Sequence, residues 1–274
     1  MVIGDHVFNT DEQCYIMGIL NVTPDSFSDG GKWDRLDNAL VRAETMVAEG
    51  ADIIDVGGES TRPGYTEVPD NMEIDRVAPV IEALRSRFDV HISVDTYKSS
   101  VAGAAIHAGA VFINDIWGLK HDADMAGLIA GSGVACCLMH NRENMDYSDF
   151  MTDMLDDLGA SVLLAKKAGI ADAKIILDPG IGFAKTYEMN LEAINRLDMI
   201  KSLGYPVMLG TSRKSVIGTA LDAPVTERLE GTLATTIIGV MRGCSIFRVH
   251  DVKETRRAIT MTQAVLGSNS TSKA

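Results

Sequence analysis

The sequence predicts an α/β fold, a single (β/α)8 (TIM) barrel with long loops after its first two strands at the C-terminal face. Short apolar runs recur about eight times along the chain, each next to a polar or charged residue. Stretches with helical spacing of apolar residues separate the runs. Continuous apolar runs are typical of parallel strands buried on both faces, and the carboxyl ends of such strands meet at one rim of a barrel. We therefore expect one site, built from the whole chain.

The runs have the same form in both halves of the sequence. In order, they are 16–20 before Asn21, 53–54 before Asp55, 92–94 before Asp95, 111–113 before Asn114, 134–139 before His140, 175–177 before Asp178, 207–209 ahead of Arg213 and Lys214, and 246–249, which contains Arg248 and precedes His250. Their shortness and β-branched content favour strands over helices.

Between the runs, apolar residues recur every three or four positions, which predicts helices with one buried face. These stripes cover residues 36–47, 74–84, 151–162, 191–200, 229–240 and 252–265. Gly50 should end the first helix, because glycine is common just after a helix. Pro79 should bend the second helix or delay its start, because its ring removes a hydrogen-bond donor.

Composition argues against several classes of protein. The 274 residues are 46% apolar and 23% charged, and this length suits one barrel of about 250 residues. A net charge of −13 and a pI near 4.8 argue against nucleic-acid and membrane partners, which require a basic face. We expect one domain over residues 1–266, followed by a Ser-rich polar tail at 267–274 that is disordered.

The amino terminus and the cysteines indicate the compartment. Residues 1–10 include an acidic residue and lack a long apolar stretch, so we expect neither a signal peptide nor a spanning helix, and a cytoplasmic protein. Cys136 and Cys137 are adjacent in a predicted strand, and Cys14 and Cys244 lie beside strands. Reduced core thiols are therefore expected.

The loops after the first two strands carry residue types that are common in binding sites. Residues 21–31 are rich in turn formers and small polar residues, and the segment is long enough to act as a lid. Residues 55–64 contain paired glycines, which permit close approach to a ligand, and Arg62, whose guanidinium suits phosphate or carboxylate. Surface loops often have this composition without binding anything, so each loop alone leaves both interpretations open.

Blocks of sequence throughout the chain resemble the dihydropteroate synthase family. They are MGILNVTPDSFSDGG at 17–31, DVGGESTRPG at 55–64, SVDT at 93–96, INDI at 113–116, LMHNR at 138–142, LDPGIGF at 177–183, SRKS at 212–215 and RVHDV at 248–252. The resemblance covers about residues 16–265. It implies a pterin-binding barrel and a transferase of folate biosynthesis that joins 4-aminobenzoate to (7,8-dihydropterin-6-yl)methyl diphosphate and releases diphosphate. It also makes the chain a candidate sulfonamide target.

The resemblance implies that the pterin ring binds polar side chains at the strand ends. A pterin edge is rich in donors, so a fixed carboxylate such as Asp178 can accept two parallel hydrogen bonds. Asp95 would accept a ring N–H, Asn114 would pair with the neighbouring edge, and Lys214 would donate to the ring carbonyl. Apolar walls would come from Ile116 and Met139. A buried Asp can instead cap the next helix, which stays open for Asp95.

Arg248 and His250 are two residues apart on the last strand, which aims both inward. A buried Arg without a partner is costly, so we expect an anion there. The resemblance places diphosphate on Asn21, Thr61, Arg248 and His250, and gives Arg248 a pterin contact as well. It makes Asn21 the protein ligand of Mg²⁺, a hard cation whose other ligands would be diphosphate oxygens and water.

For aminobenzoate, the resemblance implies a site made of Phe27, Thr61, Arg62, Pro63, Phe183 and Ser215. The two loops are expected to close over this site, with Asp29 and Arg62 as an ion pair, and to exclude water. The implied reaction is dissociative, so diphosphate leaves before the arylamine attacks. The implied catalytic residues are Asp95, Asp178, Lys214, Arg248 and His250, which place negative charge near the ring and positive charge near the leaving group.

Residues 180–186 look like a phosphate-binding loop, but Ala184 replaces the glycine expected before Lys185, so a nucleotide site is not expected. Ala184 also departs from the glycine typical of the resembled family, which leaves the role of Lys185 open.

Two alternatives remain at this point. One is a methyltetrahydrofolate:corrinoid methyltransferase type of barrel, which would share Asp95, Asn114 and Asp178 but has no use for Arg248 and His250. The other is a non-catalytic pterin-binding paralogue. A homodimer through the later helices is implied only by the resemblance.

Overall fold

A computed structural model describes residues 1–23, 32–60 and 67–268 of the chain. Its centre is a sheet of eight parallel strands, in the spatial order β8-β7-β6-β5-β4-β3-β10-β9. The strands are β3 (Tyr15–Asn21), β4 (Ile53–Gly57), β5 (His91–Asp95), β6 (Phe112–Asp115), β7 (Ala135–Met139), β8 (Ile175–Asp178), β9 (Met208–Leu209) and β10 (Ile246–Val249). A parallel bridge between Leu177 and Val207 joins the two edge strands, so the barrel is nearly closed. The predicted fold class is confirmed.

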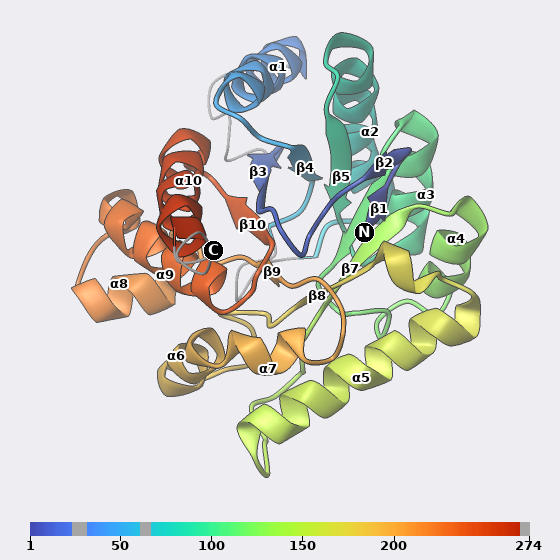
Figure 1. The fold of residues 1–274 in the computed structure, drawn as a ribbon. Helices are drawn as coiled ribbons and strands as arrows, with labels where there is room; N and C mark the ends of the chain where they lie inside the picture. Colours follow the sequence, from blue (N-terminus) through green and yellow to red (C-terminus); the bar gives the residue numbers. More distant parts are fainter. Residues whose placement is uncertain (24–31, 61–66, 269–274) are drawn as a thin grey trace.

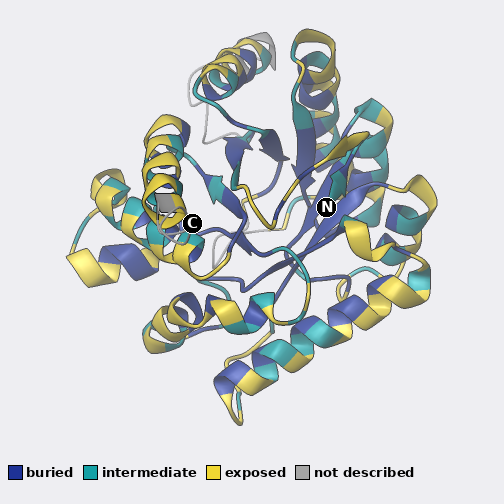
Figure 2. Cartoon of the chain, viewed as in Figure 1, coloured by how far each residue is buried: buried dark blue, intermediate teal, exposed yellow. Residues whose placement is uncertain are grey.

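The helices form a ring outside the strands (Figure 1). They are α1 (Lys32–Ala48), α2 (Asp70–Arg87), α3 (Ser99–Ala108), α4 (Met125–Ser132), α5 (Phe150–Ala168), α6 (Tyr187–Asn195), α7 (Leu197–Lys201), α8 (Ser215–Leu221), α9 (Leu229–Met241) and α10 (Val252–Ser268). Short 3-10 helices are η2 (Asp172–Lys174) and η3 (Val225–Glu227). Figure 2 shows that burial is concentrated in the strands and on the inner faces of the helices.

Alternation along each strand divides the core in two. Side chains of one parity, such as Ile54, Leu138 and Phe247, pack outward against the helices. Those of the other parity fill the barrel in a separate cluster: Met17, Ile53, Phe112, Ala135, Cys137, Ile176, Met208 and Ile246. The next positions on that inward parity, two residues later, include Asp55, Asn114, Asp178 and Arg248. The barrel interior is therefore apolar towards the amino ends of the strands and polar towards their carboxyl ends.

A short amino-terminal hairpin, β1 (Val2–Ile3) and β2 (His6–Val7), closes the apolar end of the barrel. Ile3 and Phe8 belong to the interior cluster, and the ring of Phe8 contacts those of Tyr15 and His91. The sequence analysis did not identify this hairpin, because two-residue strands are too short to show alternation.

Several predictions about the helices need correction. Helix α2 begins at Asp70 despite Pro79, so its start is not delayed. The stripe at 191–200 is not one helix, because α6 ends at Asn195 and α7 begins at Leu197. Leu191 and Val265, predicted to be buried, are both exposed. Helix α10 runs to Ser268, beyond the expected start of the tail at 267, and the rest of that tail lies outside the described residues.

Helix α9 turns a different face to the barrel than the one predicted. Its buried residues are Thr232, Thr236 and Gly239, whereas the predicted apolar stripe at 229–240 is only half-buried. The reason is close packing: a Cβ at Gly239 would lie 2.7 Å from a methyl group of Leu209. Small residues therefore face the strands, and the larger apolar ones lie to the side.

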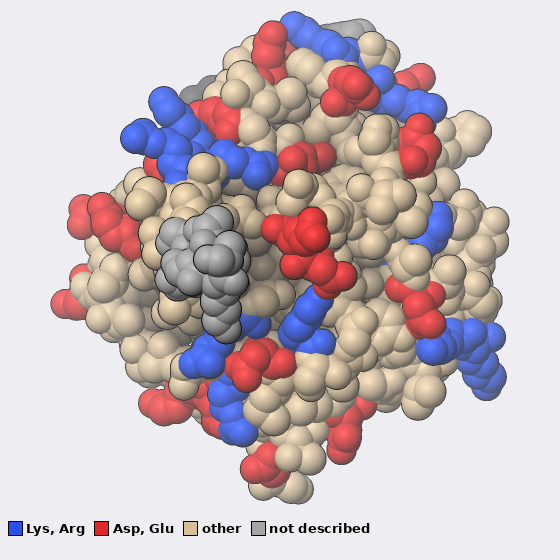
Figure 3. All heavy atoms as spheres, viewed as in Figure 1, with Lys and Arg blue, Asp and Glu red and all other residues tan. Residues whose placement is uncertain are grey.

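The cysteines, the length of the helices and the surface charges bear on the other expectations from the sequence. All four cysteines are free, and Cys136, Cys137 and Cys244 are buried, in agreement with the prediction. Among the described residues, none of the helices has both the length and the apolar character needed to cross a bilayer. On the face drawn in Figure 3, the described acidic and basic side chains are interspersed, both near the centre of the view and at its edge.

The hairpin predicts a measurable contribution to stability. Ile3→Ala should lower the free energy of unfolding by about 2 to 3 kcal/mol, because it leaves a cavity at the closed end of the barrel. Val7→Ala, on the exposed part of the same hairpin, is the matched control and should change it by less than about 0.5 kcal/mol. Denaturant titration measures both; equal effects would show that the hairpin does not seal the core.

Candidate active site at the mouth of the barrel

A buried carboxylate organises the polar layer inside the barrel. Asp55, in the middle of β4, accepts hydrogen bonds from Ser93 Oγ at 2.5 Å, Asn114 Nδ2 at 3.2 Å and Arg248 Nε at 2.6 Å. Arg248 also donates from Nη2 to Asp95 Oδ2 at 2.6 Å. Four strands, β4, β5, β6 and β10, are thus joined by one network of side chains.

This network corrects the argument made for Arg248. We expected an anion there because an unpaired buried Arg is costly, but Asp55 and Asp95 both pair with its guanidinium. The two carboxylates raise the pKa of Arg248, so it stays charged. The sequence predicts that the strand ends at Asp55, but β4 continues to Gly57, and Asp55 is not among the predicted site residues. The sequence does contain a sign of its role: Asp55 is two residues after Ile53, so both side chains point into the barrel.

Asp95 offers an acceptor to a ligand. Its Oδ1 is buried and has no hydrogen-bond partner among the described residues, and such a group costs about 1 to 3 kcal/mol if it stays unmatched. Burial raises the pKa of Asp95 to about 7, Arg248 opposes this rise and Asp55 adds to it. Asp95 does not cap the next helix, because the N-cap of α3 is Lys98. The open Oδ1 points to a donor supplied by substrate.

Asp178, Lys214 and Arg248 converge around Gly210. A Cβ at Gly210 would lie 3.8 Å from Asp178 Oδ2, 4.0 Å from Lys214 Nζ and 3.9 Å from Arg248 Cβ. Burial raises the pKa of Asp178 and lowers the pKa of Lys214 to about 8, and each charge partly offsets the shift of the other. Asp178 Oδ1 accepts the N–H of Gly180 at 2.6 Å, so part of this carboxylate has a local structural role.

An apolar surface borders these charges. Ile116, Met139 and Tyr97 form a small cluster of their own, and Phe183 and Trp117 pack against it. Lys214 Nζ lies 4.8 Å from the centre of the Phe183 ring. The two residues predicted as walls, Ile116 and Met139, and the predicted aminobenzoate contact Phe183 are therefore brought together next to Asp178 and Lys214.

His250 and Ser215 lie further out. His250 follows β10, is half-buried, and its Nδ1 is 3.0 Å from Ser212 Oγ. Ser215 is exposed at the start of α8 and lines a surface depression with Gly218, Thr219, Asp222, Ala223, Pro224 and Arg228. The other predicted contacts, Phe27, Asp29, Thr61, Arg62 and Pro63, lie outside the described residues, and so do the proposed loop closure and ion pair.

Asn21 has the position expected of a ligand for a hard cation. It ends β3 at the mouth, where a Cβ at Gly57 would lie 3.3 Å from Asn21 Oδ1 and 3.7 Å from Asp95 Oδ2. Amide and carboxylate oxygens together fit Mg²⁺. A second possible metal group among the described residues, Asp5, His6 and His91, lies at the opposite end of the barrel and was not visible as a sequence motif.

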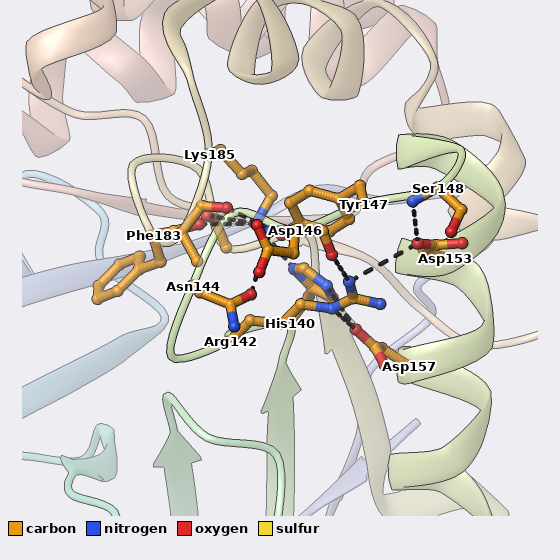
Figure 4. Close-up of polar contacts among 12 residues, drawn as sticks. His140, Arg142, Asn144, Asp146, Tyr147, Ser148, Asp153, Asp157, Phe183 and Lys185 are labelled. Carbon is orange, nitrogen blue, oxygen red and sulfur yellow. Dashed lines mark hydrogen bonds and ion pairs between the residues drawn. The ribbon is translucent and has the colours of Figure 1, made fainter.

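Lys185 is not available to a nucleotide phosphate. Its Nζ is buried and bonded to His140 Nδ1 and to the carbonyl oxygens of Gly180 and Phe183 (Figure 4). Ala184 has a φ of 44°, the left-handed region that favours glycine, in keeping with the glycine expected at this position from the resemblance.

Comparisons with known proteins agree with this geometry. The pterin binding enzyme family matches residues 17–250. Dihydropteroate synthase from Clostridium beijerinckii is 58% identical over 97% of this chain and 99% of its own length, and that from Bacillus subtilis is 56% identical over 93% and 90%.

Solved structures give the same result. A dihydropteroate synthase from Clostridium difficile, crystallised in the presence of pteroic acid, has a TM-score of 0.93 and 49% identity, and the match covers 94% of this chain and 99% of that one. The enzyme from Xanthomonas albilineans, with 4-aminobenzoic acid, has a TM-score of 0.89 and 39% identity over 93% and 94%.

The chain belongs to the pterin-binding enzyme family. Within that family its relatives identify an enzyme of the dihydropteroate synthase type, an alkyl- or aryl-transferring enzyme of folate biosynthesis.

The buried network at the mouth predicts the cost of losing its central carboxylate. Asp55→Asn should lower the free energy of unfolding by about 3 kcal/mol, because it removes one partner of a buried ion pair. Asp37→Asn, an exposed change on α1, should have almost no effect. Denaturant titration checks both, and an unchanged stability of Asp55→Asn would show that the pair is not essential to the core.

Proposed function

We propose that the mouth of this barrel binds (7,8-dihydropterin-6-yl)methyl diphosphate and 4-aminobenzoate and joins them into 7,8-dihydropteroate, with release of diphosphate. The observation that carries the proposal is the set of buried polar groups at the mouth beside an apolar surface. It offers an unmatched acceptor on Asp95, a second carboxylate on Asp178 and a cation on Lys214 to a flat heterocycle with donors and acceptors on its edge.

The pterin would lie against the polar layer. Asp178 accepts from the donor-rich edge of the ring, Asp95 Oδ1 accepts a ring N–H, and Lys214 donates to the ring carbonyl. Asn114 is held by its bond to Asp55, so its amide is oriented before substrate arrives. Ile116 and Met139 would cover one face of the ring. These contacts satisfy the acceptor on Asp95 that the described residues leave open.

The aminobenzoate would lie outside the pterin, against Phe183. Ser215, at the start of α8, would reach it at the outer edge of the mouth. Phe27, Thr61, Arg62 and Pro63 remain proposed contacts, together with closure of the loops through Asp29 and Arg62.

The reaction needs opposite charges at the two ends of the pterin substrate. The bond between the methylene carbon and the diphosphate oxygen breaks, and its electron pair leaves with the oxygen. The nitrogen of aminobenzoate then forms the new bond to carbon and loses a proton. Asp95 and Asp178 would stabilise the positive charge that develops on the pterin, while Arg248 and His250, with Thr61, would bind the departing diphosphate.

Arg248 would act from a fixed position. Its guanidinium is already held by Asp55 and Asp95, so it cannot turn freely towards the leaving group. Arg248 would therefore stabilise the diphosphate mainly through its positive charge, and His250, further out, would contact the diphosphate directly. This differs from the expectation that both residues are unpaired anion ligands.

We propose Mg²⁺ as the cofactor, held by Asn21 and by oxygens of the diphosphate. The ion would neutralise charge on the leaving group when bound. The fit rests on Asn21 Oδ1, a neutral amide oxygen at the end of β3, because the diphosphate would supply the negative charge.

We also propose a homodimer and a cytoplasmic location. Exposed apolar residues occur on the later helices α8, α9 and α10, where such a dimer would bury them: Leu221, Ile238, Met241 and Met261. Sedimentation velocity tests the dimer, and a monomer at micromolar concentration contradicts it.

The assay for this function also separates it from its alternatives. Protein with Mg²⁺ and both substrates should incorporate radiolabelled aminobenzoate into dihydropteroate, and a sulfonamide should compete. Tight pterin binding without product would favour the non-catalytic paralogue, and methyl transfer from a methylated folate would favour the methyltransferase. The high identity to synthases favours the first outcome.

Asp178→Ala should abolish this activity by preventing pterin binding. Each ring donor left without an acceptor in the buried pocket costs about 1 to 3 kcal/mol, so two of them weaken binding by roughly two or more powers of ten. Calorimetric titration with the pterin substrate measures the loss, and Asp156→Ala, an exposed change on α5, is a control. Retained affinity in Asp178→Ala would disprove the proposed pose.

Pterin affinity should follow a bell-shaped dependence on pH. Below about 7, Asp95 is protonated and no longer accepts from the ring; above about 8, Lys214 is neutral and loses its charge. Affinity should therefore rise through the first value and fall through the second. Asp95→Asn should remove the contribution of Asp95 to the acidic limb, leave the contribution of Asp178, whose pKa is also raised by burial, and keep the alkaline limb. A profile of Asp95→Asn identical in shape to that of the unaltered protein would contradict the assignment.

A further inference from the structure

Lys185 is a buried amine that the proposed reaction does not use; burial lowers its pKa to about 7, and the charge of Asp178 opposes this shift. Its Nζ donates to His140 Nδ1 at 2.8 Å, to the carbonyl of Gly180 at 3.0 Å and to that of Phe183 at 3.0 Å. An ammonium has three N–H groups, so all of its donors have partners. Two of these partners belong to the segment 180–183, which follows β8. Lys185 therefore links the first and last residues of this segment through one amino group.

His140 and Asp157 fix the ammonium in turn. His140 is fully buried, and its Nε2 is 3.0 Å from Asp157 Oδ2 on α5, which also accepts from Arg142 Nε at 2.6 Å. Because Asp157 is an acceptor and Lys185 a donor, His140 must be neutral, with its proton on Nε2. Burial and the charge of Lys185 lower the pKa of His140 to about 3, which agrees with this assignment. Figure 4 shows these side chains between α5 and the segment.

The segment that Lys185 holds carries three contacts of the site. The N–H of Gly180 binds Asp178 Oδ1, the carbonyl of Ile181 accepts from Lys214 Nζ, and the ring of Phe183 belongs to the apolar surface. A shift of this segment would move the proposed pterin carboxylate and the proposed aminobenzoate wall together.

Left-handed backbone angles occur within the segment and directly after it. Gly180, Gly182 and Ala184 all have positive φ, and for Ala184 this costs about 1 kcal/mol or more. A Cβ at Gly180 would overlap the carbonyl oxygen of His140, so the backbone of the segment packs directly on the end of β7. Two side chains from outside the segment bond to it: Asn190 Oδ1 accepts from the N–H of Gly182 at 2.6 Å, and Lys185 donates to the carbonyls at both of its ends.

We propose that Lys185, held by His140 and Asp157, is a positioning residue that keeps residues 180–183 in the conformation that orients Asp178 and Phe183 for substrate. The proposal deepens the proposed function and rests on the roles given there to Asp178 and Phe183. Lys185 itself touches neither substrate.

The first test removes the ammonium and keeps the length of the side chain. Lys185→Met should weaken binding of the pterin diphosphate with Mg²⁺ about tenfold in calorimetry, and should raise the KM for aminobenzoate by a similar factor. Lys167→Met, an exposed change on α5, is the matched control and should leave both values unchanged. Circular dichroism confirms that each variant is folded.

A double-mutant cycle separates positioning from general loss of stability. If Lys185 acts through Asp178, Lys185→Met should weaken pterin binding less than about threefold in an Asp178→Asn background. An equal tenfold loss in both backgrounds would overturn the proposal, and so would unchanged pterin affinity in Lys185→Met when Asp178→Asn alone shows a loss. Unaltered affinity in Asp178→Asn would overturn the proposed pterin pose, and this inference with it.

The histidine gives a second route if Lys185→Met does not fold. His140→Asn keeps an acceptor near the place of Nδ1, whereas His140→Leu offers none. We expect pterin affinity close to the unaltered value in His140→Asn and about a tenfold loss in His140→Leu. Equal affinities in the two variants would show that the bond to Lys185 does not position the site.

Discussion

The guanidinium of Arg248 between Asp55 and Asp95 is the interaction on which the site depends. It joins β10 to β4 and β5 across the inside of the barrel, where both carboxylates are buried and the guanidinium is mostly buried. Two carboxylates share one cation, so the group keeps a negative charge that a donor-rich ring can meet. Both oxygens of Asp55 accept hydrogen bonds, from Ser93, Asn114 and Arg248. Asp95 Oδ1 has no hydrogen-bond partner among the described residues. The two carboxylates differ in role because Asp55 lies deeper inside the barrel, whereas Asp95 lies at the carboxyl end of its strand.

That depth is set by the layers of the barrel. Apolar side chains fill the lower interior, and the amino-terminal hairpin closes it with Ile3 and Phe8. The polar layer therefore rests on a dry, close-packed floor, which strengthens its electrostatic interactions and raises the cost of any unmatched group. A site of this kind is selective for a ligand whose edge matches it, because a wrong partner leaves buried groups unsatisfied.

Support for the mouth also comes from the helical layer. Asp157 on α5, His140 after β7 and Lys185 before α6 form a chain of polar contacts that ends on the segment 180–183. The segment meets Asp178 and Lys214 on its other side. Residues that are not proposed to contact substrate thus connect the ring of helices to the substrate groups.

The sequence by itself determined the fold class and most of the residues at the mouth. Continuous apolar runs that end in Asp95, Asn114 or Asp178 identify the buried strands and the polar residues at their ends. This is possible because the spacing of apolar residues and the residue types of turns are local properties of the sequence. It did not determine which side chains pair. Asp55 was missed as the partner of Arg248, and Lys185 was left without a role, because these contacts join residues 193 and 45 positions apart. Helix α9 likewise turned its small residues inward because Leu209 requires close packing, which no local pattern encodes. Pairing and depth depend on how strands and helices meet in space, so only the tertiary structure decides them.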